Sequence, residues 1–81
     1  MNELSPSLTQ FLLDQPETSE GLHIVSASLF NGRVFDDVAI TDCSVVVAVR
    51  GRSFVPFDAR DIVRVEVTHR RWGSGWQSPH R

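Results

Sequence analysis

The sequence predicts a mainly β fold, in which a short N-terminal helix is followed by a five-stranded, strongly bent antiparallel barrel. Two observations predict this order. The hydrophobic period changes once, from helical spacing to strand alternation, and an Asn31-Gly32 pair stands between two apolar segments, as in a hairpin. The chain has 81 residues, 41% of them hydrophobic, which is enough for one small domain. We expect that domain over residues 1–69, and a flexible tail containing arginine and tryptophan over residues 70–81.

The helix is predicted over residues 5–15. Ser5 is a favourable N-cap, and Pro6 suits the first helical position, where a missing N–H costs nothing. Pro16 ends the helix, because the residue before a proline is disfavoured in the α region. A helix this short is not stable alone in water, so its apolar side must pack on the sheet. We expect that side to carry Leu8, Phe11 and Leu12.

Short segments of alternating or continuous apolar residues predict the five strands. They cover residues 23–30, 33–41, 44–50, 53–57 and 62–68. The first two flank Asn31-Gly32, and the consecutive polar residues Asp36 and Asp37 predict a bulge or a sharp bend in the second. β-branched residues fill the third strand almost without interruption, so we expect it to be the most buried strand, with Val47 in the core.

Short turns lead into the last two strands. Gly51 and Arg52 turn the chain into the fourth strand. Residues 58–61 form a single tight turn or 3₁₀ turn, which Asp58 is expected to cap. The fifth strand alternates valine with polar residues, so we expect it to be half-exposed, with one face formed by Val63, Val65 and Val67.

Charge is distributed unevenly along the chain. Residues 1–42 contain one arginine and seven acidic residues, whereas residues 43–81 contain seven arginines and three acidic residues. The net charge of −2 argues against a dedicated nucleic-acid-binding protein, but the local potential of the second half weakens that argument. The sequence contains no lysine, so its fixed positive side chains are planar guanidinium groups suited to phosphate, carboxylate or stacking contacts.

The sequence lacks the residues that disulfides, metal sites and catalytic sites need. The single cysteine, Cys43, excludes an internal disulfide and a CxxC metal clamp, and its position beside an apolar strand predicts a buried side chain. The three histidines have no metal-ligand spacing, and the adjacent Asp36 and Asp37 point to opposite faces of a strand. No Ser/His/Asp arrangement or glycine-rich phosphate loop is visible. We therefore expect no enzyme, no cofactor and no metal.

The sequence also bears on localisation. It has neither the roughly 20 consecutive apolar residues of a membrane helix nor the pattern of a signal peptide. Together with the single cysteine, this predicts a cytoplasmic protein without membrane association.

The order of these elements, with these turns, resembles the Sm-like family, which includes the Sm and LSm proteins and the bacterial Hfq-type RNA chaperones. The resemblance covers about residues 5–68 and implies the family's small, SH3-like five-stranded barrel. Residues 29–33, Leu-Phe-Asn-Gly-Arg, are similar to the Leu-x-Asn-Gly turn between the family's first two strands. Arg50-Gly51 is similar to the Arg-Gly pair of the second Sm motif, and Asp42 stands where the family has an acidic residue after the second strand.

The resemblance implies a homo-oligomer that binds single-stranded RNA. Sm-like subunits pair the edges of their last two strands, which here are residues 53–57 and 62–68. Pro56 has no N–H to donate to such a contact, so the size of the oligomer stays open. Residues 57–59, Phe-Asp-Ala, replace the Tyr-Lys-His element of the Hfq type. The family site residues that carry over are therefore Asp42, Arg50 and Gly51.

For Asp42, the resemblance implies a role in orienting a base, and the alternative is a turn or a strand-end cap. Arg50 and Arg52 flank Gly51 at a predicted hairpin tip, where two guanidinium groups can grip phosphates or an acidic surface. The alternative there is a solvated turn.

The tail interleaves cations with aromatic rings, a composition that suits stacking on single-stranded nucleic acid. The residues concerned are Arg70, Arg71, Trp72 and Trp76. Alternatively, the tryptophans pack on the barrel or in a subunit contact. Two functions stay open: an RNA-binding Sm-like oligomer, and a protein-interaction or regulatory module with the same barrel and no nucleic-acid role.

Overall fold

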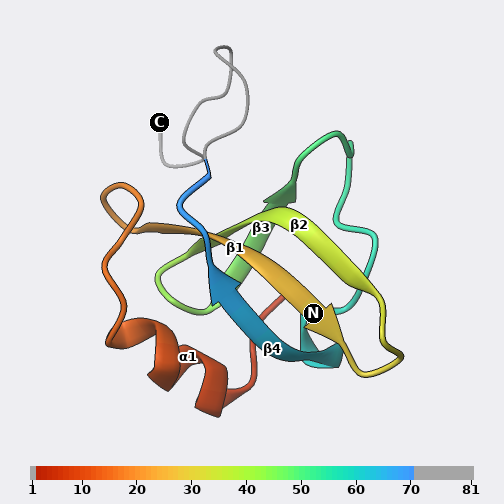
Figure 1. Cartoon of the computed structure of the whole chain (residues 1–81), viewed down its shortest axis with the longest axis horizontal. Helices are drawn as coiled ribbons and strands as arrows, with labels where there is room; N and C mark the ends of the chain where they lie inside the picture. The colour runs from red at the N-terminus through yellow and green to blue at the C-terminus, as the bar shows by residue number, and fades with distance from the viewer. Residues whose placement is uncertain (1, 71–81) are drawn as a thin grey trace.

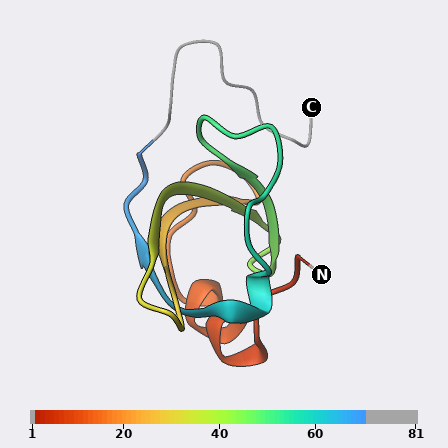
Figure 2. The same ribbon diagram turned by 90° about the vertical axis from the view of Figure 1, so that its right-hand side faces the viewer.

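The computed structural model describes residues 2–70, which form one short α-helix, a 3₁₀ turn and a four-stranded antiparallel sheet (Figure 1). The elements are α1 (Pro6–Leu13), β1 (Leu22–Leu29), β2 (Val34–Thr41), β3 (Val45–Val49), η1 (Ala59–Asp61) and β4 (Ile62–Val67). The strand order is β3-β2-β1-β4, so β3 and β4 are the two edges. Figure 2 shows that the sheet is strongly bent. A mainly β fold with an N-terminal helix is thus confirmed.

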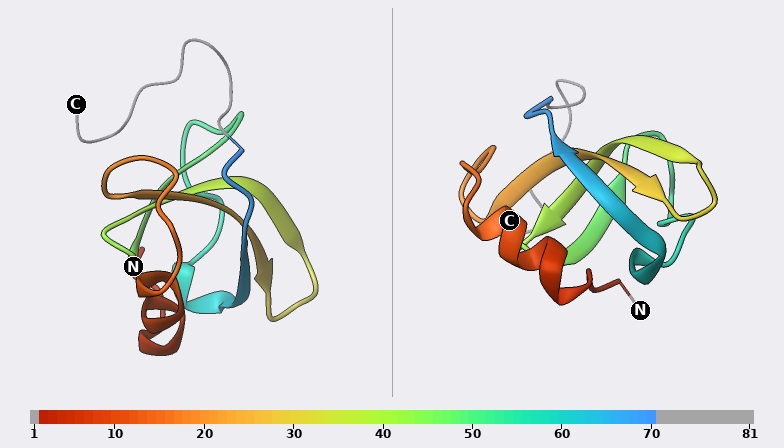
Figure 3. Two further views of the ribbon diagram at one scale, coloured as in Figure 1. Left: turned by 60° about the vertical axis from the view of Figure 1, so that its left-hand side comes forward. Right: turned by 60° about the horizontal axis from the view of Figure 1, so that its bottom comes forward.

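The N-terminal helix begins where its capping residues predict, but it ends at Leu13, two residues before the predicted end at residue 15. Ser5 is the N-cap with an extended backbone, and Pro6 occupies the first helical position. α1 lies beside β4 (Figure 3). Leu12 is fully buried and Leu8 is partly buried, as predicted, whereas Phe11 keeps 43% of its surface exposed. Within residues 2–70, no helix is both long and apolar enough to cross a membrane.

The hairpin between β1 and β2 turns at Asn31-Gly32, as predicted. The N–H of Gly32 donates to the carbonyl oxygen of Leu29 at 3.0 Å, and the N–H of Leu29 donates to the carbonyl oxygen of Arg33 at 2.8 Å. Gly32 has a φ of +89°, a conformation that glycine adopts without strain. The result is a three-residue turn closed by a glycine bulge.

The predicted bulge in β2 is also confirmed. Asp36 and Asp37 together lie opposite Ser26 of β1, so β2 has two residues where β1 has one. Asp37 adopts a φ of +56°, which aspartate tolerates better than most residues. The bulge bends β2 and turns the Asp37 side chain inward, where it is 5% exposed.

The fourth predicted strand is absent: residues 53–57 form no strand. Val55 and Phe57 pack on the core without joining the sheet, and Phe54 is 68% exposed. Pro56 removes a backbone donor that a strand would need, so this segment packs two half-buried apolar side chains on the core without a ladder of hydrogen bonds. Over residues 2–70 the sheet therefore has four strands, and residues 53–57 offer no strand edge for an oligomer contact.

The prediction that the third strand is the most buried is wrong, because β3 is an edge strand. Three of its five residues, including Val47, are only half-buried, whereas Val46 is 1% exposed. β2 also has six of its eight residues buried, but its other two are exposed whereas those of β1 are half-buried, so the most buried strand is β1. It is paired on both sides, and its two faces contribute to two separate apolar clusters.

β4 has one irregularity that the alternation of valines did not predict. Ile62 pairs with Leu29 and Arg64 pairs with Ser28, so Val63 is an extra residue in β4. The extra residue places Ile62 in the core at 3% exposure and leaves Val63 61% exposed. Val63 therefore does not share the burial of Val65.

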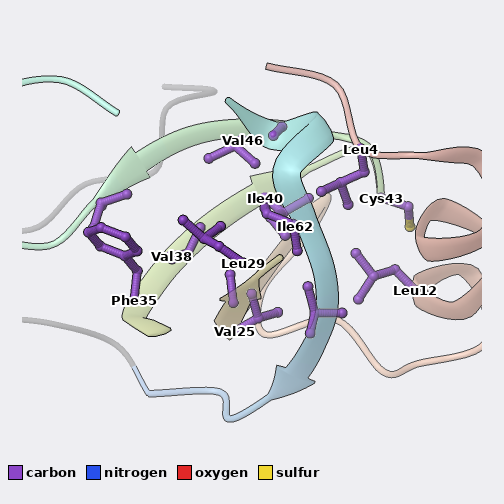
Figure 4. Close-up of a cluster of buried hydrophobic side chains, with 14 residues drawn as sticks. Leu4, Leu12, Val25, Leu29, Phe35, Val38, Ile40, Cys43, Val46 and Ile62 are labelled. Atoms are coloured by element: carbon purple, nitrogen blue, oxygen red, sulfur yellow. The ribbon is translucent and has the colours of Figure 1, made fainter. Parts of the chain in front are cut away.

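The main core lies inside the bend of the sheet (Figure 4). All four strands contribute to it, together with Leu12 from α1, Leu4 from the N-terminal segment and Ala59 from η1. Cys43 is buried at its margin, as predicted. The smaller second cluster lies on the other face of the sheet and contains Leu22, Ile24 and Ala39.

Candidate nucleic-acid interface

Two arginines from distant parts of the chain converge on Asp37. The Nη1 atom of Arg50 lies 3.4 Å from Asp37 Oδ2, and the Nη2 atom of Arg70 lies 3.5 Å from the same oxygen. The aspartate side chain is 8% exposed, whereas those of Arg50 and Arg70 are 52% and 63% exposed. A buried carboxylate thus holds two guanidinium groups that still face solvent.

Backbone contacts bring both arginines to this point. The N–H of Arg50 donates to the carbonyl oxygen of Asp37 at 3.1 Å, which holds the end of β3 against the bulge. After β4, the N–H groups of Thr68 and His69 donate to the carbonyl oxygen of Ile24, so the chain crosses β1 toward β2. The position of Arg70 beside Arg50 is therefore set by the sheet.

One oxygen of this carboxylate has no partner. Asp37 Oδ1 is buried and accepts no hydrogen bond within the part of the chain that the structure describes. A buried charged group with an unsatisfied oxygen is unfavourable, and the two arginines at Oδ2 offset only part of that cost. The arrangement is therefore costly for a purely structural role.

A second pair of arginines lies over an aromatic ring on the same strand. The guanidinium carbon of Arg33 is 5.1 Å from the centre of the Phe35 ring, and that of Arg52 is 5.9 Å from it. Phe35 also contacts Phe57, with ring centres 4.9 Å apart. Cation–π attraction holds both guanidinium groups near the ring, and both arginines are exposed.

Together, these four residues form what we call the arginine face. It surrounds the first half of β2 and consists of Arg33, Arg50, Arg52 and Arg70. The acidic residues of β2 beside it are Asp37 and the exposed Asp36, which accepts a hydrogen bond from Ser26 Oγ at 2.7 Å. The four guanidinium groups outnumber these two carboxylates in a protein of net charge −2.

Gly51 contributes to the arginine face through its backbone. The N–H of Arg52 donates to the carbonyl oxygen of Val49 at 3.1 Å, closing a tight turn in which Gly51 has a φ of +77°. A side chain at Gly51 would be strained in this conformation, although the space around it is open. The turn is the one the sequence predicts, but no hairpin follows, because residues 53–57 form no strand.

Asp42 does not join the arginine face. It follows the last residue of β2, where Asp42 and Cys43 both have positive φ angles in a two-residue turn closed by the N–H of Ser44 and the carbonyl oxygen of Thr41 at 3.0 Å. Seven residues separate it from Phe35, which corresponds to about 20 Å along a strand. Asp42 is therefore a turn residue at the other end of β2.

Of the predicted site residues, the structure brings together Arg50, Gly51, Arg52 and Arg70. Arg71, Trp72 and Trp76 lie outside the described residues. Sequence reasoning missed Arg33, Phe35 and Asp37 as parts of the surface. The signal for Asp37 was its place in the bulge, because a residue inserted into a strand is reoriented relative to its neighbours.

The side chains of His23 and Cys43 are also buried, and His23 Nδ1 has no hydrogen-bond partner within residues 2–70. The Nε2 atom of His23 lies 3.1 Å from the carbonyl oxygen of Gln15, which ties the end of the helical segment to β1. Burial, followed by the charges of Glu17 and Asp42, raises the pKa of the Cys43 thiol, so it stays protonated at neutral pH. Within residues 2–70, His, Cys, Asp and Glu side chains form no group of three or more suited to a metal ion.

Comparison of the chain with protein-family models, with curated proteins and with solved structures found no match.

Proposed function

We propose that this protein is a non-enzymatic binding module that contacts single-stranded RNA through the arginine face. The observation that carries the proposal is the convergence of Arg50 and Arg70 on Asp37, with Arg33 and Arg52 beside them on Phe35. All four guanidinium groups are exposed, so they can donate to a ligand without breaking the fold. We also propose that the protein is cytoplasmic.

The chemistry of this surface fits a flexible, anionic and aromatic ligand. Guanidinium groups donate paired hydrogen bonds to phosphate oxygens, and these contacts position a backbone without reading sequence. Their planar faces also stack on unpaired bases, which single-stranded RNA exposes and a duplex does not. An RNA phosphate near Arg50 and Arg70 would compete with Asp37 for the same donors.

The resemblance to the Sm-like family supports RNA as the nucleic acid. The helix, the bent sheet and the turn at Asn31-Gly32 are in the order that the family has. Residues 53–57 stand where the family has its short fourth strand, and a five-stranded Sm-like barrel would require them to pair. Under this proposal Arg71, Trp72 and Trp76 extend the binding surface beyond Arg70, and Asp42 serves as a turn residue.

Fluorescence anisotropy with a short, labelled oligouridine at low salt tests the proposal. The intact chain is expected to raise the anisotropy, and added salt is expected to weaken binding. Arg52→Ala removes one charge-assisted contact and is expected to lower affinity about tenfold. It should also reduce the slope of log K against log salt by about 0.7.

The matched control is Arg60→Ala, which removes the same charge from η1. Arg60 is exposed and lies outside the arginine face, so affinity should stay close to that of the parent. Equal losses in the two variants would show only a net-charge effect. No anisotropy change for the parent protein would reject RNA binding.

A protein-interaction module is the second candidate, and a specific observation favours it. An open groove lies between α1 and β4, lined by apolar side chains from both elements, among them Leu8, Phe11 and Val65. If the anisotropy does not change with RNA, this groove becomes the candidate binding surface, with a protein as the ligand.

A further inference from the structure

The two edges of the sheet differ in how they are covered. At β3, the N-terminal segment adds a short bridge between Glu3 and Val45, with the N–H of Leu4 donating to the carbonyl oxygen of Ser44 at 2.7 Å. The outer edge of β4 pairs with no strand within residues 2–70, where its strand partner is β1 alone, and α1 lies beside it across a groove. In the part of the chain that the structure describes, the N-terminal segment thus reaches the beginning of β3, whereas the outer edge of β4 has no strand partner.

Arg64, Glu66 and the extra residue Val63 protect the edge of β4 in part. The strand contains neither proline nor lysine, and its extra residue, Val63, lies near its beginning, leaving Arg64 to Val67 regular. Unpaired backbone groups on a regular edge strand favour pairing with another strand. The valine at the bulge is itself 61% exposed.

The groove beside this edge is also apolar. Ser7, Leu8, Phe11 and Gln15 of α1 line one side, and the residues from Val63 to Val67 line the other. Of the two apolar residues of α1 that line the groove, Leu8 is partly buried and Phe11 is 43% exposed. A strand added to β4 would cover the exposed parts of Phe11 and Val63.

The sequence of β4 is complementary to itself. Arg64 and Glu66 flank Val65, and both are exposed. If two copies of β4 pair in antiparallel orientation with Val65 opposite Val65, each Arg64 lies opposite a Glu66, and the extra residue Val63 lies outside the regular part of the strand. A slip of two residues would put like charges opposite each other, and a slip of one would mix valine with charged side chains on one face.

We propose that β4 is a dimerisation edge that pairs with β4 of a second copy of this chain. A ring needs two different edges, whereas a single open edge can pair only with itself, so the contact is two-fold and closes at a dimer. Two four-stranded sheets then form one continuous sheet, and the arginine face of each copy stays exposed. The proposal does not depend on RNA binding.

Light-scattering mass and sedimentation velocity on the intact chain test the proposal. The expected result is a dimer mass at micromolar concentration. Glu66→Arg places arginines opposite each other at two positions and is expected to weaken dimerisation about tenfold or more. Arg64→Glu is expected to do the same with two glutamates.

The decisive variant exchanges the two residues. Arg64→Glu combined with Glu66→Arg has the composition of the parent and restores opposite charges across the pair, so it is expected to dimerise again. Arg60→Glu, on η1, is the control for a charge reversal outside the edge and should remain dimeric. Circular dichroism checks that each variant is folded.

Three outcomes would overturn the proposal. The first is a monomer mass for the parent protein at high micromolar concentration. The second is a parent dimer that Glu66→Arg and Arg64→Glu leave unchanged. The third is a closed oligomer larger than two, because that requires a second edge.

Discussion

Asp37 combines three properties that rarely coincide in one residue. Its φ is +56°, its side chain is 8% exposed, and one carboxylate oxygen has no hydrogen-bond partner within residues 2–70. A positive φ favours glycine, asparagine and aspartate, so backbone conformation explains part of the choice. Contact with Arg50 and Arg70 explains the charge, because the carboxylate is what holds both guanidinium groups in one place.

Substitutions at Asp37 should separate the backbone contribution from the charge. Asp37→Asn keeps a residue that tolerates a positive φ. The side chains of Arg50 and Arg70 are more than half exposed, so we expect the loss of their ion pairs to lower the unfolding free energy by about 1 kcal/mol or less. Asp37→Ala adds the cost of a left-handed alanine, about 1–2 kcal/mol. Asp37→Gly should recover part of that cost. Urea unfolding measures the series, and equal losses for Asn and Ala would contradict the backbone argument.

Among the elements, β3 shows most clearly how a strand's place in the sheet decides its burial. Its five residues are apolar, yet only Val46 and Val49 are buried, because β3 pairs with β2 on one side. Val46 lies opposite Ile40, and Val47 is an extra residue between two regular pairs. The continuous apolar run is therefore the sequence of a bulged edge strand whose residues contact two different clusters.

Two adjacent substitutions in β3 test this placement. Val46→Asp puts an unpaired charge into the main core, where Val46 is 1% exposed. The whole domain is stabilised by only about 4–12 kcal/mol, so we expect this variant to be unfolded. Val47 is half-buried, so Val47→Asp should lower stability yet leave a folded protein. Thermal melts followed by circular dichroism compare the stability of the two variants. If Val47→Asp were the more destabilising, Val47 and not Val46 would face the main core, which would contradict this placement.

At the scale of residues 2–70, the N-terminal segment bridges to β3 at one edge of the sheet, and β4 at the other edge has no second strand partner. The arginine face surrounds β2, an inner strand, whereas the proposed dimer contact lies on β4. Binding of RNA and pairing of two copies therefore use different surfaces. A dimer would present two arginine faces to one strand of RNA.

Dimerisation through β4 predicts that thermal stability depends on protein concentration. Association stabilises the folded state by mass action, so Tm should rise as the protein is concentrated. Glu66→Arg should abolish that rise while retaining a cooperative transition. Differential scanning calorimetry over a concentration series measures it. A Tm independent of concentration in the parent protein would contradict the dimer.

Local chemistry in the sequence predicted the local features correctly. Ser5 and Pro6 start the helix, Asn31-Gly32 forms the hairpin turn, and Asp36 with Asp37 forms the bulge. Asp58 caps the 3₁₀ turn, accepting a hydrogen bond from the N–H of Arg60 at 2.9 Å. Each of these signals acts over a few residues, so a short stretch of sequence contains all of its partners.

Tertiary structure alone decided the strand order, the loss of the strand at residues 53–57 and the composition of the arginine face. An apolar segment has the same sequence whether its strand has one neighbour or two, and Val55 and Phe57 pack on the core without a ladder of hydrogen bonds. Arg70 is 33 residues from Asp37 and meets Arg50 there only because β4 lies next to β1. Pairing of strands and convergence of charges depend on contacts between distant segments, which local periodicity does not encode.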